Sequence, residues 1–230
     1  MLIGNEAQRA EIVQKFNHRF SGMEMALWCL SVHSRASLLA RESSPVLEAL
    51  VWTIKCFWSV QGVPESAKPQ MAKALAELMP WSPELFAPQT NYGQETANEA
   101  REWVEKLIRR SMLLGVGRRE CSWASKILHC LMPWRVPVLD SRVCDFLRVP
   151  KTWDLSRKYR KVTTDVFEMA RMTAGECNWI GELEPRSQLR ALDKYMWWKS
   201  TPDPYRAPFY RDPCKVLRQL GLPCVISHCR

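Results

Sequence analysis

Residues 113–143 read LLGVGRRECSWASKILHCLMPWRVPVLDSRV, and this stretch carries the clearest structural signal in the chain. Gly115 and Gly117 stand one residue apart, directly after an amphipathic pattern that ends at Met112. Glycine has no Cβ, so two glycines at this spacing allow a sharp turn with positive φ. A second helix is expected to begin near Ser122 after this turn. Its apolar stripe is Ala124, Ile127, Leu128 and Leu131.

A glycine turn between two helices has two interpretations. Exposed backbone amides at the turn and at the start of the second helix can hold a phosphate group. The alternative is an ordinary helix–turn–helix connection without a ligand. If the turn binds DNA, we expect the contacts to come from Gly115, Gly117, Arg118, Arg119, Ser122 and Arg142.

Asp140 stands directly before an expected helix over 141–148. At this N-cap position the helix dipole and the free amides favour the ionised carboxylate. The residue can be a helix cap only, or it can also present its charge to a substrate.

The whole stretch resembles the helix-hairpin-helix DNA glycosylases. Their hairpin reads Leu-Pro-Gly-Val-Gly, and their second helix leads to a Pro-hydrophobic-hydrophobic-Asp segment. Here the hairpin is residues 113–117, with Leu114 in place of the proline, and the acidic segment is residues 136–140. Relative to Asp140 the hairpin lies farther upstream than in the family, which implies an insertion around 119–121.

A second resemblance covers residues 44–54, SPVLEALVWTI, which are similar to the Pro-Phe-Glu-Ala-Leu-Val-x-x-Ile helix that opens the family's core. In the family a glutamine follows this helix and fills the hole left by the flipped base. This chain has Lys55, Cys56 and Phe57 there, and Gln61 is out of register. The two resemblances together cover residues 44–148.

The resemblance implies an all-α protein with two helical lobes around a cleft. It implies one helical domain over residues 1–230, with a glycosylase-like core at 44–148, its hairpin at 113–123 and C-terminal helices at 149–230 that complete the cleft. Helical patterns agree with an all-α chain. They predict helices at 26–40, 46–60, 66–79, 98–112, 141–148, 161–173, 186–199 and 213–220, with a loop at 79–93.

The implied activity is extrusion of a nucleotide and hydrolysis of its N-glycosidic bond, which leaves an abasic site. In this chemistry Asp140 would stabilise the oxocarbenium-like sugar and orient the attacking water. Bifunctional members use a lysine whose position corresponds to Ser122 counted from Asp140, or to Arg119 counted from the hairpin. Lys126 lies one turn beyond Ser122 on the same face, or is a solvent-facing lysine. A monofunctional glycosylase without lyase activity is therefore the expectation.

Aromatic residues are abundant, with 11 Trp in 230 residues. In a glycosylase, flat side chains hold the extruded base. The candidates for this base pocket are Trp52, Phe57, Trp58, Trp197 and Trp198, and the polar residues of segment 193–199 are embedded among aromatics. His129, on the Lys126 face, is expected to be a surface or hydrogen-bonded histidine rather than a proton shuttle.

The charge balance is basic, with 33 Lys+Arg against 24 Asp+Glu and a net charge of +9. Such an excess favours a polyanionic partner, here double-stranded DNA, although solvated helix faces would also account for it. The nine cysteines form no CxxC pair and no iron–sulfur spacing, so no metal or cofactor is expected. With a polar N-terminal segment and no membrane-spanning stretch, we expect a cytoplasmic, nucleoid-associated monomer.

Two other functions remain open from the sequence. One is a non-catalytic helix-hairpin-helix module that binds DNA, and the other is a helical partner-binding protein with a basic surface. The base that a glycosylase of this kind would excise is not encoded in any motif. A bulky modified base, as found in some viral genomes, is our hypothesis, and it would give an antiviral role beside DNA repair.

Overall fold

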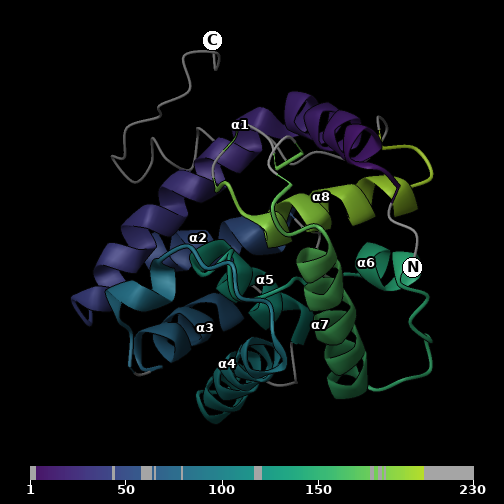
Figure 1. The fold of residues 1–230 in the computed structure, drawn as a ribbon. Coiled ribbons are helices and arrows are strands. Elements are labelled where there is room, and N and C mark those ends of the chain that lie inside the picture. The colour runs from purple at the N-terminus through teal and green to yellow at the C-terminus, as the bar shows by residue number, and fades with distance from the viewer. Residues whose placement is uncertain are drawn as a thin grey trace.

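The computed structural model describes residues 4–42, 45–57, 64, 66–78, 80–116, 121–176, 179–180, 183 and 185–204, with the backbone alone at 56 and 57. Over these residues the protein is helical and contains no strand, as the sequence predicts (Figure 1). The elements are α1 (Glu6–Leu39), α2 (Pro45–Phe57), α3 (Ala67–Ala76), the 3-10 helix η1 (Pro83–Phe86), α4 (Gln94–Leu113), α5 (Cys121–Leu131), α6 (Ser141–Phe146), α7 (Leu155–Met172) and α8 (Gln188–Ser200). No described helix is both long and apolar enough to cross a lipid bilayer.

Helix α5 lies at the centre of the molecule, in contact with α1, α2, α4 and α7. Every residue of α5 except Ser122 is buried. The fully buried Trp123 joins α5 to α2, because its indole Nε1 donates a hydrogen bond of 3.2 Å to the carbonyl oxygen of Val51. The helix therefore has no solvent-facing side, although its sequence shows a single apolar stripe.

Helix α1 is much longer than predicted, since it begins at Glu6 and not near residue 26. Asn5 and Gln8 form a capping box, in which the Asn5 side chain accepts from the Gln8 amide at 2.9 Å. The prediction failed because the first half of α1 is largely polar and its apolar residues are widely spaced. Three of them are nevertheless buried: Val13, Phe16 and Phe20.

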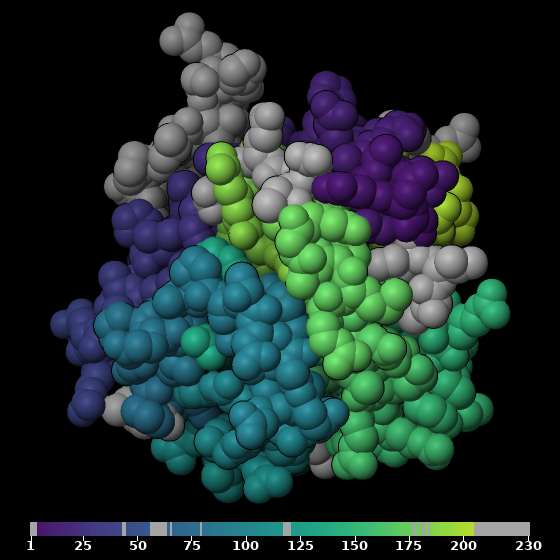
Figure 2. Space-filling view, in the orientation of Figure 1, coloured from purple at the N-terminus to yellow at the C-terminus, as the bar shows by residue number. Residues whose placement is uncertain are grey.

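The C-terminal helices also differ from their predicted bounds. Helix α7 begins at Leu155 and not at 161, because Asp154 caps it by accepting from the Arg157 amide at 2.9 Å. Helix α8 packs against α1, α6 and α7, and α7 lies beside α4 on the face shown in Figure 2. The helix predicted at 213–220 lies outside the described residues.

The turn after α4 has the hydrogen bonds of a Schellman motif. The Gly115 amide donates to the Met112 carbonyl at 3.0 Å, and the Val116 amide donates to the Ser111 carbonyl at 3.0 Å. Gly115 has φ +95°, and Val116 is buried behind it. The predicted glycine turn is confirmed at Gly115, and Gly117 lies outside the described residues.

Substitution of Gly115 tests the conformational demand of this turn. A Cβ at Gly115 meets no atom within 4 Å, so Gly115→Ala adds backbone strain without a steric clash. We expect a loss of about 1–2 kcal/mol in the free energy of unfolding, measured by urea denaturation. Gly22→Ala is the matched control, because Gly22 is helical with equally open space and should gain up to about 1 kcal/mol. A Gly115→Ala variant as stable as wild type would contradict the argument.

Candidate active site

Asp140 caps α6, as predicted. Its backbone is extended, with φ −132° and ψ 154°, and its Oδ1 accepts a hydrogen bond of 2.8 Å from the Arg142 amide. The Asp140 carbonyl accepts the first helical hydrogen bond, from the Cys144 amide at 2.9 Å. The cap fixes the carboxylate at the positive end of this short helix.

Two serines of α5 hold the residue before Asp140 in place. The Leu139 amide donates to Ser125 Oγ at 3.0 Å, and Ser122 Oγ donates to the Leu139 carbonyl at 2.8 Å. Both polar backbone groups of Leu139 are therefore satisfied by side chains of one helix. Ser122, predicted to contact DNA, uses its hydroxyl hydrogen to position the Asp140 segment.

Two further side chains fix the start of the same segment. His129 Nδ1 donates to the Val136 carbonyl at 2.6 Å, and the Tyr159 hydroxyl donates to the Pro137 carbonyl at 3.2 Å. His129 is buried and hydrogen-bonded through Nδ1, so it is the hydrogen-bonded histidine of the two alternatives and not a surface one. The acidic segment is therefore anchored by α5 and α7 from Val136 onward.

Lys126 and Asp140 form an ion pair inside the protein. Lys126 Nζ lies 2.8 Å from Asp140 Oδ2, and the side chains are only 3% and 10% exposed. The alternative of a solvent-facing Lys126 is therefore wrong, because helices pack against α5 on all sides. Lys126 lies instead against Asp140 in the interior of the protein.

Burial of this pair has an energetic consequence. Removing two charges from water is costly, and their attraction offsets the cost only while both partners are present. Buried charges of this kind are concentrated at functional sites, although structural ion pairs also occur. The pair is therefore a candidate for chemistry as well as a structural contact.

A second buried charge cluster lies between α1 and α8, next to the first. Arg190 contacts both Glu24 and Asp193, while Lys194 Nζ lies 3.0 Å from Glu24 Oε2 and 2.7 Å from Asn17 Oδ1. Burial opposes ionisation of Glu24, but Arg190 and Lys194 outweigh it and lower the pKa of Glu24 to about 2. The cluster fastens α8 to α1 through charges that are compensated within the protein.

Asp193 connects this cluster electrostatically to Asp140. Burial raises the pKa of Asp193 to about 6, the contact with Arg190 opposes the shift, and the charge on Asp140 adds to it. From the sequence, Asp193 and Lys194 stood out only as polar residues among aromatics, and Glu24 and Arg190 were not predicted. The spacing of residues 190, 193 and 194 on one helix face was the available signal.

The predicted base-pocket residues occupy two separate places. Trp197 and Trp198 of α8 pack edge-to-face on Phe20 of α1, with ring centroids 5.5 and 6.4 Å apart. Trp52 of α2 is half-buried, with Lys55 Nζ 4.2 Å from its ring centroid. These residues do not form one pocket with each other. The side chain of Phe57 and the whole of Trp58 lie outside the described residues.

Of the predicted DNA contacts, three can be placed. Gly115 ends the turn after α4, Ser122 faces the Asp140 segment, and half-buried Arg142 donates from Nη1 to the Ser200 carbonyl at 3.4 Å. Gly117, Arg118 and Arg119 lie outside the described residues. Within the described ranges, no three His, Cys, Asp or Glu side chains gather as a metal ion requires.

Comparisons with known proteins found no matching family model, no matching curated protein and no matching solved structure.

The burial of His129 should make the free energy of unfolding depend on pH. Burial and the charges of Arg190 and Lys194 lower the pKa of His129 to about 3, although its hydrogen bond to Val136 and the charge of Glu24 act in the opposite direction. In the unfolded chain the histidine pKa is near 6.5, so between about pH 3 and pH 6.5 the unfolded chain binds a proton at His129 and the folded protein does not. The stability that His129 provides is thus complete above about pH 6.5 and is lost as the pH falls toward 3.

We expect this contribution to fall by about 2 kcal/mol between pH 6.5 and pH 5, at 1.36 kcal/mol per pH unit and proton. Urea unfolding of wild type and His129→Gln across this range measures it as the difference between the two pH profiles, which cancels the titration of the carboxylates. Parallel profiles would show that His129 does not titrate as stated.

Proposed function

We propose that this chain is a DNA N-glycosylase of the helix-hairpin-helix type, with Asp140 as the catalytic carboxylate. One observation carries the proposal: a glycine turn after α4 is followed by α5, and the segment after α5 ends in a carboxylate fixed by a helix cap and by a buried lysine of α5. The sequence of that turn and of the acidic segment resembles the glycosylase signature, and the basic charge suits a DNA substrate.

The site supplies what this hydrolysis needs. As the bond between C1′ and the base nitrogen breaks, positive charge develops on the sugar, and a carboxylate beside C1′ stabilises it. A water molecule adds its oxygen to C1′ and gives up one proton to a carboxylate. The nucleobase leaves with the electron pair of the bond between C1′ and its nitrogen. Asp140 stabilises the charge and accepts that proton, and Lys126 holds Oδ2 in position.

The proposal assigns two lobes to the fold, one from α2 to α5 and the other from α1, α7 and α8. Asp140 belongs at their junction, because it pairs with Lys126 of α5, starts α6 and lies within electrostatic range of Asp193 of α8. The side chain of Asp140 is one-tenth exposed, so entry of a sugar requires the lobes to move apart when DNA binds.

The target is proposed to be a modified or damaged base, and specifically a bulky base of the kind found in some viral genomes. The departures from the family's hairpin and glutamine step support a target other than the common oxidised or deaminated bases. Excision of such a base would act in antiviral defence, and excision of a damaged base would act in DNA repair.

A second candidate function is a non-catalytic DNA-binding module. The observation that favours it is the enclosure of Asp140, since Oδ1 caps α6 and Oδ2 pairs with Lys126. In that case the ion pair holds α5 and α6 together and no base is released.

Asp140→Asn separates the two functions. Oligonucleotides and phage DNAs with different modified bases are incubated with the protein, and abasic sites are detected by alkaline cleavage. We expect base release by wild type and a loss of at least about 10²–10³-fold in the variant, because the neutral amide no longer stabilises the sugar. DNA binding should be nearly unchanged.

Asp145→Asn is the matched control, because Asp145 is an exposed carboxylate on the same helix. Circular dichroism would be used to check that each variant is folded under the assay conditions. Equal base release by wild type and Asp140→Asn would refute the catalytic assignment, and no release from any substrate would favour the binding module.

Lys126 is expected to position Asp140 and not to form a Schiff base. Borohydride treatment during turnover should therefore give no covalent protein–DNA adduct, and a trapped adduct would overturn the monofunctional assignment.

Lys126→Met leaves a buried carboxylate uncompensated and should lower the free energy of unfolding by about 3–5 kcal/mol. The double variant Lys126→Met/Asp140→Asn should recover part of this loss in urea denaturation.

A further inference from the structure

A groove of about 550 Å³ runs between α4 and α7, beside the site described above. Its floor is formed by buried residues, among them Cys121 at the start of α5 and Tyr159 of α7. The charged lining is basic in balance, with two glutamates and four cations. These cations are Arg101, Lys106, Arg109 and Arg160.

Two of the four cations are compensated by carboxylates on α4. Lys106 Nζ lies 2.8 Å from Glu102 Oε1, and Arg109 Nε lies 3.3 Å from Glu105 Oε1. Each is an i,i+4 pair at the exposed surface of α4, where such pairs contribute only a few tenths of a kcal/mol. The two glutamates of the groove are thus already engaged.

The other two cations, Arg101 and Arg160, have no carboxylate partner among the described residues. Arg101 donates to the Asn98 side chain, a neutral acceptor. Partial burial of Arg101 and the positive charge of Arg160 both lower the pKa of Arg101, which places the two guanidinium groups within electrostatic range across the groove. Two like charges held in this way repel each other until an anion lies between them.

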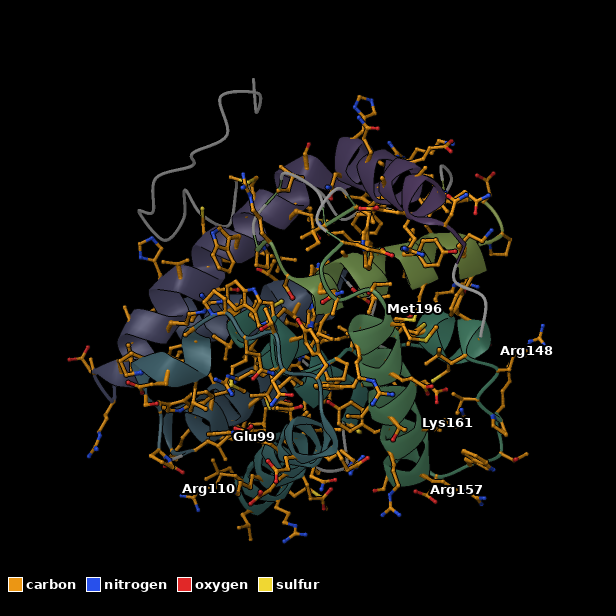
Figure 3. The ribbon with its side chains drawn as sticks, in the orientation of Figure 1. Glu99, Arg110, Arg148, Arg157, Lys161 and Met196 are labelled. Carbon is orange, nitrogen blue, oxygen red and sulfur yellow. The ribbon has the colours of Figure 1, made fainter. Side chains whose placement is uncertain are left out.

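Basic residues continue beyond the groove at the start of α7. Arg157 stacks on Trp153 with its guanidinium carbon 4.0 Å from the ring centroid, and Lys158 Nζ donates to the Lys151 carbonyl at 2.8 Å. Figure 3 shows Arg157 on α7 and Arg148 in the turn after α6 along the same edge of the molecule. A row of cations suits a polyanion better than it suits a single phosphate ion.

We propose that the α4–α7 groove binds the phosphodiester backbone of DNA, with Arg101 and Arg160 contacting phosphate oxygens. Guanidinium groups bind phosphate by paired N–H donors, and the released counterions favour the complex. The choice of DNA as the partner rests on the proposed function. The affinity of the groove for phosphate rests on the two arginines.

The groove also adjoins the candidate active site. Cys121 in its floor precedes Ser122, which holds Leu139, and Tyr159 in its floor donates to the Pro137 carbonyl. The turn at Gly115 follows α4, which forms one wall. A strand in the groove would therefore lie against the elements that carry Asp140.

The test is the binding of the full chain to an unmodified, fluorescein-labelled DNA duplex, followed by anisotropy over a range of salt concentrations. Arg101→Gln/Arg160→Gln removes the two uncompensated cations. We expect the Kd to rise roughly tenfold at low salt and the slope of log K against log salt to become shallower by about 2.

Arg171→Gln/Lys199→Gln is the matched control. It removes the same charge from exposed positions at the ends of α7 and α8, and it should change the Kd less than twofold. Equal weakening in both double variants would mean that only net charge matters, and that result would overturn the groove proposal. Wild-type affinity in Arg101→Gln/Arg160→Gln, or no DNA binding by wild type, would overturn it too.

The outcome is separable from that of the proposed catalysis. Loss of binding in the groove variant without base release from any substrate would support the groove and contradict the glycosylase. Base release that depends on Asp140, with unchanged binding in the groove variant, would support the glycosylase and contradict the groove.

Discussion

The contact between Lys126 and Asp140 imposes the main constraint on this structure. Two opposite charges lie inside the protein at 2.8 Å, and neither is stable there without the other. Helix α5 must therefore keep one register relative to the start of α6. The hydrogen bonds from Ser122, Ser125 and His129 to the intervening segment maintain that register.

The charge cluster of α8 extends the same constraint to α1. Arg190, Glu24 and Lys194 compensate one another, while Asp193 lies close enough to Asp140 for the two carboxylates to repel. A positive charge on His129 would be unfavourable here, because the ring is buried and Arg190 is near. The interior therefore combines fixed ion pairs with a neutral histidine, and the pairs of Glu24 with Arg190 and Lys194 form only where α1 and α8 come together.

Local patterns in the sequence predicted the parts of the fold that depend on neighbouring residues. The turn at Gly115, the cap at Asp140 and the apolar stripe of α5 each follow from the properties of a few consecutive residues. Burial of Lys126 could not be predicted in this way. It depends on helices that are distant in sequence and cover the polar side of α5, which a helical period cannot reveal.

The long α1 is a second example of a feature that local sequence patterns could not predict. Its first half is too polar to predict a buried face, yet Phe16 and Phe20 pack on Trp197 of α8 with ring centroids 5.7 and 5.5 Å apart. Glu24, which pairs with Arg190, also lies before the predicted start of this helix. A partner of the α8 charges could be recognised only after α1 and α8 had been placed side by side.

The charges of the groove and of the ion pair differ in their exposure to solvent, and this difference would separate the proposed binding from the proposed catalysis. The charge of Lys126 is compensated by Asp140 inside the protein, so it attracts a distant polyanion little. Arg101 and Arg160 lack carboxylate partners among the described residues and lie in a groove at the surface. The attraction of DNA would depend on salt, because exposed charges are screened. The buried pair would respond little to salt, because solvent ions do not reach it. In the proposed function, the surface cations would recruit a phosphate backbone, while the enclosed Asp140 would stay oriented toward an extruded sugar.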